Sequence, residues 1–287
     1  MNKTKIEWTE ATWNPVTGCT PITIGCEHCY AARIAWRLRG RHGYPEDDPF
    51  RVTRHPDRLN KPLRFRKPRM IFVCSMGDLF HEDVPNEYIV EVFKVMAACP
   101  QHTFQVLTKR PGRAHDVLWQ HNTEHVFVGG GAKATWPLPN AWLGVSVENQ
   151  RTADERIPLL LETPAACRFV SIEPMLGPVD LEELDGPGMW WDALRGHVME
   201  KGGAGFEREY DVSRLDWVIV GGETGPGARP MQSDWVRAIR DECVKRGVPF
   251  FFKQWGSASP ERDLKAKKGG RILDGRTWDE MPNWRRP

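Results

Sequence analysis

Six short apolar runs constrain the fold of this chain more than any other feature of its sequence. Continuous apolar runs of this length are typical of strands buried on both faces of a sheet. Most of them recur at roughly 25–40 residues, with helix-like stretches between them, which is the period of βα units. The runs are MIFVCS (70–75), TFQVLT (103–108), WLGVSV (142–147), RFVSI (168–172), WVIVG (217–221) and PFFFK (249–253).

A further strand expected just before Cys19 brings the number of β units to seven. The sequence therefore predicts an α/β fold built as a parallel (β/α) barrel, partial or complete and TIM-like, with a doubly wound open sheet as the alternative. We expect this barrel over residues 1–254, with insertions near 128–141 and 185–214. Residues 255–287 are expected to form a polar and basic C-terminal extension.

The N-terminus and the hydropathy pattern both point to a cytoplasmic protein. The sequence has no apolar run of 18 or more residues, so no membrane span is expected. The first residues lack the apolar segment of a secretory signal. In a reducing compartment, clustered cysteines indicate metal binding or catalysis before they indicate disulfides.

Three of the seven cysteines lie within eleven residues, at Cys19, Cys26 and Cys29. A disulfide would leave one of these thiols over, and structural zinc prefers four ligands. Three thiolates with one open position suit a [4Fe–4S] cluster whose fourth iron binds a small molecule. Zinc with a histidine such as His42 stays open as the alternative. The other four cysteines are expected to be buried in the core: Cys74, Cys99, Cys167 and Cys243.

A polar or ionisable group follows each predicted strand. In a parallel barrel these ends carry the chemistry, so the residues are candidate ligand contacts. The acidic ones have an alternative role, because a carboxylate at a helix N-terminus caps the helix favourably. The candidates are Asp78, Lys109, Arg110, Ser146, Glu148, Glu173, Gly221, Gly222, Glu223 and Lys253.

These features carry a family resemblance. Three cysteines in the first β→α loop, ending C-x2-C-Tyr, resemble the radical S-adenosylmethionine superfamily, although the first gap is longer than its usual C-x3-C and His28 stands where an aromatic residue is usual. From Lys3 to Pro282 the chain also resembles the phage Gp37/Gp68 family, also called DUF5131. The blocks that carry this second resemblance are KIEWTEATWNPVTGC, CEHCYA, SMGDLF, LTKRP, LGVSVEN, SIEPMLGP, VIVGGETGPGARPM and FFFKQWG.

The resemblance implies an enzyme with two cofactors, a [4Fe–4S] cluster and S-adenosyl-L-methionine, that generates a 5′-deoxyadenosyl radical. Cys19, Cys26 and Cys29 would hold the cluster. Cofactor contacts are expected first at Gly77 and Asp78, near the methionine amino group, and then at Ser146, Glu148, Gly221 and Gly222. The residues expected to act on the substrate are Lys109, Glu173, Glu223 and Lys253, with Arg110 also facing it.

The distribution of charge suggests a class of substrate. Net charge is only +2, but residues 31–69 hold twelve Lys and Arg against four Asp and Glu. This segment and the C-terminal tail, with Trp36, Trp255 and Trp284, suggest phosphate contacts and stacking platforms for a nucleic acid. Modification or repair of a nucleic acid base is therefore our first hypothesis.

Three alternatives stay open: radical modification of a peptide or of a partner protein from a neighbouring gene, a non-catalytic Fe–S or zinc-stapled nucleic-acid-binding module, and a metal-assisted hydrolase. A flavodoxin- or ferredoxin-type reductant is an expected partner of the radical enzyme.

Overall fold

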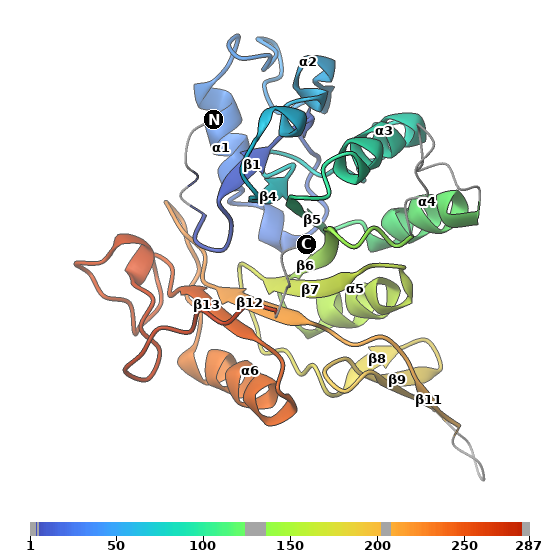
Figure 1. The fold of residues 1–287 in the computed structure, drawn as a ribbon. Coiled ribbons are helices and arrows are strands. Elements are labelled where there is room, and N and C mark those ends of the chain that lie inside the picture. The colour runs from blue at the N-terminus through green and yellow to red at the C-terminus, as the bar shows by residue number, and fades with distance from the viewer. Residues whose placement is uncertain (1–3, 5, 124–135, 202–207, 283–287) are drawn as a thin grey trace. The chain divides into compact units, whose positions relative to one another are not determined.

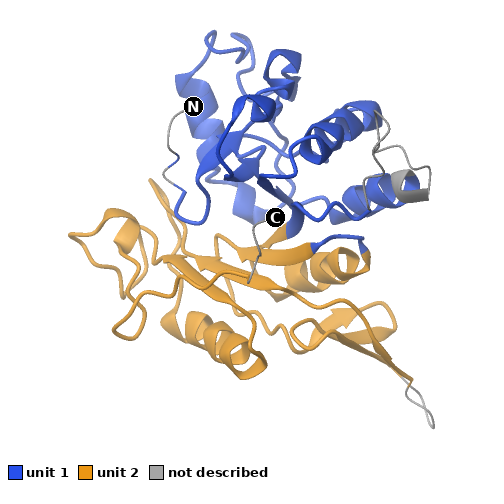
Figure 2. Ribbon diagram, in the orientation of Figure 1, with its two compact units in different colours: residues 1–144, 163–166, 285–287 blue, residues 145–162, 167–284 orange. Residues whose placement is uncertain are grey.

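The computed structural model describes residues 4, 6–123, 136–201 and 208–282 (Figure 1). The chain divides into two compact units, drawn in different colours in Figure 2. Unit 1 comprises residues 1–144, 163–166 and 285–287, and unit 2 comprises residues 145–162 and 167–284.

The apolar runs form the strands of one seven-stranded sheet, in the order β1-β4-β5-β6-β7-β12-β13. The division between the units falls within β6 (Ala141–Val147), which is buried along its whole length. Burial on both faces explains why these strands read as continuous apolar runs rather than as alternating ones.

In unit 1, β4 (Met70–Val73) pairs in parallel with β1 (Ala11–Trp13) and with β5 (Thr103–Thr108). α3 (Asn86–Ala97) connects β4 to β5, and α4 (Pro111–Thr123) follows β5. The apolar side of α3 is buried, and Trp13 packs against Phe104 with ring centroids 5.7 Å apart. The smaller elements are β2 (Val16–Thr17), β3 (Thr53–Arg54), η1 (Ile24–Cys26), α1 (Tyr30–Arg37), α2 (Pro56–Leu59) and η2 (Pro62–Arg64).

In unit 2, β12 (Trp217–Gly221) pairs in parallel with β7 (Cys167–Ile172) and with β13 (Phe250–Gln254). α5 (Gln150–Glu162) precedes β7, and α6 (Ser233–Arg246) precedes β13. The C-cap residue of α6 is Gly247, whose positive φ of 64° suits the glycine that the sequence places there.

The expected insertion at 185–214 is a second, antiparallel sheet in unit 2. Its strands lie in the order β11-β10-β9-β8 and are β8 (Leu184–Gly186), β9 (Met189–Asp192), β10 (His197–Glu200) and β11 (Glu209–Asp211). Of the other expected insertion, residues 128–135 lie outside the described residues, and 136–140 lead into β6.

The described part of the C-terminal segment packs onto unit 2 instead of forming a separate extension. Trp278 is buried and stacks edge-on against Phe250, and its carbonyl accepts a hydrogen bond from the Phe252 N–H. Trp255 is also buried, with only 4% of its surface exposed. The only regular element in the described part of this segment is the short η3 (Lys267–Gly269). Trp255 therefore serves the core and offers no exposed ring for stacking, while Trp284 lies outside the described residues.

The structure confirms an α/β fold with a parallel seven-stranded sheet. β1 and β13 stand at the two ends of the strand order, and within the described ranges no pairing joins them, so the sheet is open there rather than a closed barrel. None of the helices in those ranges has the length and apolar character that spanning a bilayer requires.

Candidate functional site

Two glycines let the cysteine loop of unit 1 pack closely against the loop that follows β4. Gly18 has a φ of +85°, and a Cβ on it would lie 2.2 Å from the Arg51 carbonyl oxygen. The Gly18 N–H donates to the Met76 carbonyl at 2.8 Å. A Cβ on Gly77 would lie 2.6 Å from the Gly18 carbonyl oxygen. Gly77 therefore has a packing role beside the first cysteine, because only glycine allows so close an approach of two backbones.

The three clustered cysteines occupy three consecutive features of that loop. Cys19 follows Gly18, Cys26 ends η1, and Cys29 is the N-cap residue of α1. All three are partly exposed and none forms a disulfide. The other four cysteines are buried, as the sequence predicted, at Cys74, Cys99, Cys167 and Cys243.

Arg110, at the end of β5, reaches the first of these cysteines. Its Nη1 lies 3.4 Å from the Cys19 Sγ, and its Nη2 donates to the Thr20 carbonyl at 3.2 Å and to the Thr20 Oγ1 at 3.0 Å. Only 7% of Arg110 is exposed. This guanidinium thus ties the end of β5 to the cysteine loop, whereas the sequence suggested that it faces the substrate.

Asp78 and Glu82 hold Arg110 in place. The Arg110 Nε donates to the Glu82 carboxylate at 3.0 Å, and Nη1 lies 3.4 Å from Asp78 Oδ2. Asp78 is 6% exposed and also accepts hydrogen bonds from the Thr108 hydroxyl at 2.8 Å and the Lys109 N–H at 3.0 Å. The donors around Asp78 are groups of the protein itself, so this carboxylate acts as an internal anchor in the structure.

The cysteines sit in different electrostatic environments. Burial, and secondarily the Asp78 charge, raises the pKa of Cys19 to about 11 against the opposing effect of Arg110. Burial also acts to raise the pKa of Cys26, but the Lys109 charge and hydrogen bonds from Ile22 and Thr23 outweigh it and lower that pKa. In the β5–α4 connection, Arg110 therefore contacts the Cys19 thiol, and the charge of Lys109 acts on the Cys26 thiol.

The donor set fits an iron–sulfur cluster in its chemistry. Thiolates are the ligands such clusters take, and hydrogen bonds and cations near the sulfurs offset their negative charge. Among the residues that the structure describes, no three His, Cys, Asp or Glu side chains are already gathered as a metal-holding group.

A second group of charged residues lies at the strand ends of unit 2. The Lys253 Nζ, on β13, lies 2.6 and 2.7 Å from the two carboxylate oxygens of Glu173, just after β7. Gln254 donates through Nε2 to Glu173 at 3.0 Å and to the Gly222 carbonyl at 3.1 Å. The Lys253 and Glu173 side chains are 13% and 22% exposed. The structure thus brings Glu173, Lys253 and Gln254 together, whereas the sequence had suggested no role for Gln254.

The two glycines at the end of β12 differ in what they permit. A Cβ on Gly222 would lie 2.0 Å from the Trp255 carbonyl oxygen, so glycine is required there by internal packing. A Cβ on Gly221 would meet Glu173 Cδ and Lys253 Cβ at 3.4 Å, within ordinary contact distance. Gly221 therefore borders the Glu173–Lys253 pair, whereas Gly222 supports the backbone behind it.

The remaining acidic candidates of unit 2 each have an arginine partner nearby in the sequence. Glu148 is fully buried, 3.4 Å from Arg156 Nη1. Glu223 is 7% exposed and accepts from Arg229 through both carboxylate oxygens, at 2.7 and 2.9 Å. Ser146 donates to the Glu173 carbonyl at 3.2 Å.

Glu148 does not cap α5. That position belongs to Asn149, whose Oδ1 accepts the Thr152 N–H at 3.1 Å. The Thr152 hydroxyl in turn accepts the N–H groups of Glu148 and Asn149 at 2.9 and 3.2 Å, in a reciprocal arrangement like a capping box.

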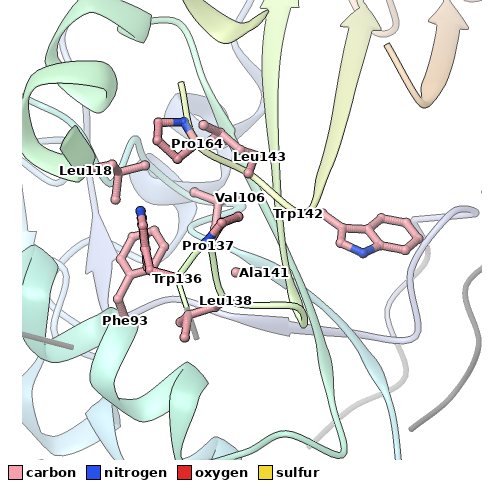
Figure 3. Close-up of a pocket in the computed structure, with 11 residues that line it drawn as sticks. Phe93, Val106, Leu118, Trp136, Pro137, Leu138, Ala141, Trp142, Leu143 and Pro164 are labelled. Atoms are coloured by element: carbon pink, nitrogen blue, oxygen red, sulfur yellow. The ribbon is translucent and has the colours of Figure 1, made fainter. Parts of the chain in front are cut away.

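An apolar cavity in unit 1 is too small to hold a substrate or cofactor. Its volume is about 10 Å³, which is no more than a single water molecule needs. Figure 3 shows its lining side chains, among them Phe93, Leu118, Trp136 and Leu138. None of the candidate residues lines it, so it is a gap in the core packing rather than a site.

Comparisons with known proteins bear on the family alone. No curated protein and no solved structure matches this chain. One family model, described as "Protein of unknown function (DUF5131)", matches residues 3–282, which is nearly the whole sequence. The family resemblance drawn from the sequence blocks is thereby confirmed, and the chain belongs to the DUF5131 family.

Proposed function

We propose that this protein is a radical S-adenosylmethionine enzyme in which Cys19, Cys26 and Cys29 hold one [4Fe–4S] cluster. The observation that carries the proposal is the setting of the cysteine loop. Its three thiols are partly exposed, and Arg110 and Lys109 place positive charge near Cys19 and Cys26. The chemistry supplied by the bound cluster and S-adenosylmethionine is reductive cleavage of a sulfonium, which yields methionine and a 5′-deoxyadenosyl radical.

The contacts in unit 1 support a positioning role for its strand-end residues. Asp78 and Glu82 orient Arg110, and Arg110 fixes Cys19 and Thr20. Gly77 leaves room for the cysteine loop. We assign Asp78 to this anchoring, since a contact with the methionine amino group would have to compete with the internal donors that it already accepts.

In unit 2 we assign ligand contact to Glu173 and Lys253, together with Gly221 beside them. The pair is partly exposed, and a lysine ammonium is a compact cation with three rotatable donors that can turn toward an anionic ligand. Glu148 and Glu223 support the structure through Arg156 and Arg229, and Ser146 fixes the backbone at Glu173.

For the substrate we propose a nucleic acid base, with phosphate contacts from the basic side chains at the end of η2 and just after it. Arg64, Arg66 and Lys67 are exposed there, and no acidic residue lies between Arg58 and Arg69. Binding of RNA and DNA oligonucleotides as a function of salt concentration tests this part. A steep salt dependence supports a nucleic acid substrate, and a shallow one favours a peptide.

The decisive experiment is anaerobic. The protein is reconstituted with iron and sulfide, both are counted, and 5′-deoxyadenosine is measured after reduction with dithionite in the presence of S-adenosylmethionine. We expect about four irons per chain, as a [4Fe–4S] cluster requires, and 5′-deoxyadenosine formation that the Cys19/Cys26/Cys29→Ala triple variant loses.

Cys99→Ala is the matched control, because it removes a buried thiol of unit 1 that lies outside the cysteine loop. Bound zinc with no cleavage of S-adenosylmethionine would overturn the proposal and make the cysteine loop a structural staple.

A further inference from the structure

Exposed apolar side chains gather around the cysteine loop. Of the twelve large hydrophobic residues exposed in the described part of the chain, five lie within the fifteen residues from Ile22 to Trp36. Single exposed hydrophobic residues are ordinary, but a local concentration marks an interaction surface. These five are Ile22 (43% exposed), Ile24 (46%), Tyr30 (46%), Ile34 (36%) and Trp36 (56%).

α1 is amphipathic, and its outer side is both apolar and basic. Ala31 and Ala35 lie on the buried side of α1 and pack in a small cluster with Tyr44 and Met76. Arg33, Ile34 and Arg37 are related by helical spacing on another side of α1, next to Trp36. We call Ile22, Ile24, Arg33, Ile34, Trp36 and Arg37 the α1 surface.

This region carries a net positive charge. From Thr20 to Arg41 the chain carries four arginines and one acidic residue, Glu27. A partner that binds here should therefore carry negative charge, because complementary potentials speed encounter and fix orientation. The three isoleucines indicate a protein partner rather than a nucleic acid, since bases stack on aromatic rings and not on aliphatic side chains.

The place of this surface in the chain indicates what such a partner does. Cys26 and Cys29 lie between Ile24 and Ile34, and Cys29 is the N-cap of α1 itself. A protein seated on the α1 surface would thus cover the segment that carries Cys26 and Cys29, both of which are partly exposed. Small, transient interfaces with a basic side and an acidic side are typical of electron-transfer pairs.

We propose that the α1 surface is the docking site of an acidic, low-potential electron-transfer protein of the flavodoxin or ferredoxin class. This inference rests on the proposed function, because it concerns the electron that the enzyme requires. One electron leaves the reduced donor and enters the bound cluster, and no atom is transferred between the two proteins.

The test compares two sources of electrons for the same reconstituted protein. 5′-Deoxyadenosine formation is measured with dithionite, and separately with an acidic flavodoxin kept reduced by its NADPH-dependent reductase. For Arg33→Glu/Arg37→Glu we expect the flavodoxin-driven rate to fall by about tenfold or more, with a raised half-saturating flavodoxin concentration. The dithionite-driven rate and the iron content should stay within about twofold of wild type, because neither arginine was placed in the cofactor site.

Arg195→Glu reverses an exposed arginine of unit 2 and serves as the matched control, with no expected effect on either rate. Trp36→Ala tests the apolar part of the surface without a change of charge, so it separates loss of contact from electrostatic repulsion.

The failures are distinguishable. If dithionite drives no cleavage in the wild-type protein, the proposed function has failed and the docking site with it. If dithionite works but both variants keep the wild-type flavodoxin-driven rate, the docking site alone is wrong. If the α1-surface variants lose oligonucleotide binding while their flavodoxin-driven rate is unchanged, the α1 surface binds nucleic acid instead.

Discussion

The Asp78–Arg110 pair of unit 1 and the Glu173–Lys253 pair of unit 2 both lie at strand ends but differ in their exposure. In unit 1, Asp78 and Arg110 are 6% and 7% exposed and are engaged with each other, Thr108, Glu82 and the cysteine loop. In unit 2, Glu173 and Lys253 pair closely but are partly exposed. The comparison separates charges that build a site from charges that can meet a ligand, although both look alike in the sequence.

The carboxylates at the strand ends also differ in whether an arginine or a lysine is their partner. Asp78, Glu148 and Glu223 each pair with an arginine, whose fork of donors can satisfy a carboxylate and neighbouring carbonyl groups together. Glu173 pairs with Lys253, a point charge on a flexible stem. The arginine pairs of Asp78 and Glu148 are buried on both sides, whereas Arg229, the partner of Glu223, is 27% exposed. The lysine pair is the one that can rearrange most easily, because its cation holds a single point of charge on a flexible stem.

The largest expected effect is the loss of the buried carboxylate in unit 1. Asp78→Asn keeps the size of the side chain but leaves the Arg110 charge with a poorer partner, so the free energy of unfolding should fall by about 3 kcal/mol. Glu173→Gln, in the partly exposed pair of unit 2, should lower it by about 1 kcal/mol or less. Urea unfolding of the two variants measures the difference, and equal losses would remove the distinction between the two regions.

Next in size is the effect of replacing the guanidinium at the cysteine loop. Arg110→Lys keeps the charge but cannot reach Cys19, Thr20 and Glu82 at once, and we expect a loss of about 2 kcal/mol of stability. After reconstitution this variant should retain less than about half of the wild-type iron, because the loop that carries Cys19 is no longer fixed.

Arg156→Lys is the matched control for that experiment, since it makes the same change in the buried pair of unit 2. It should lose similar stability and keep its iron. Equal iron retention in the two variants would show that Arg110 supports folding alone.

A smaller effect should appear in the pH dependence of unit 2. Burial raises the pKa of Glu242 to about 7, with Asp180 and Glu182 adding to the effect and the Leu181 N–H opposing it. Since the folded-state pKa lies above the ordinary value of 4.5, the stabilisation is present below pH 4.5 and is lost as the pH rises through 7. We expect about 1 kcal/mol less stability at pH 8 than at pH 5 from this group.

Glu242→Gln should flatten that pH profile, whereas Glu183→Gln, at an exposed carboxyl of the same unit, should leave it unchanged. The assignment would be contradicted if the wild type became more stable between pH 5 and pH 8, or if Glu242→Gln had the same pH profile as the wild type.

The last prediction concerns reactivity within unit 1 and leaves stability unchanged. In metal-free protein at neutral pH, iodoacetamide should modify Cys26 at least about fivefold faster than Cys19, because the pKa of Cys26 is lowered and that of Cys19 is raised. Tandem mass spectrometry of timed samples gives the order. Lys109→Ala should slow the alkylation of Cys26. Alkylation of Cys19 faster than that of Cys26 would contradict the assigned pKa directions.

Features that depend on local pattern could be read from the sequence. Continuous apolar runs predicted the strands, because burial on both faces leaves a signal in every residue of a strand. The isolated cysteines among apolar neighbours were correctly expected to be buried, as at Cys74 and Cys243. Family membership also followed from short contiguous blocks of sequence.

The pairing of Arg110 and of Lys253 could not be read from the sequence, because the partners lie far apart in the chain. Arg110 lies 91 positions from Cys19 in the chain, and Lys253 lies 80 positions from Glu173, so no periodicity links the partners. The sequence offered Asp78, Glu173 and Trp255 for contact with ligands, yet the structure buries Asp78 and Trp255 among internal partners and leaves Glu173 partly exposed. Local pattern fixes which face of an element is apolar, whereas the partner of a charge depends on how distant strands are brought side by side.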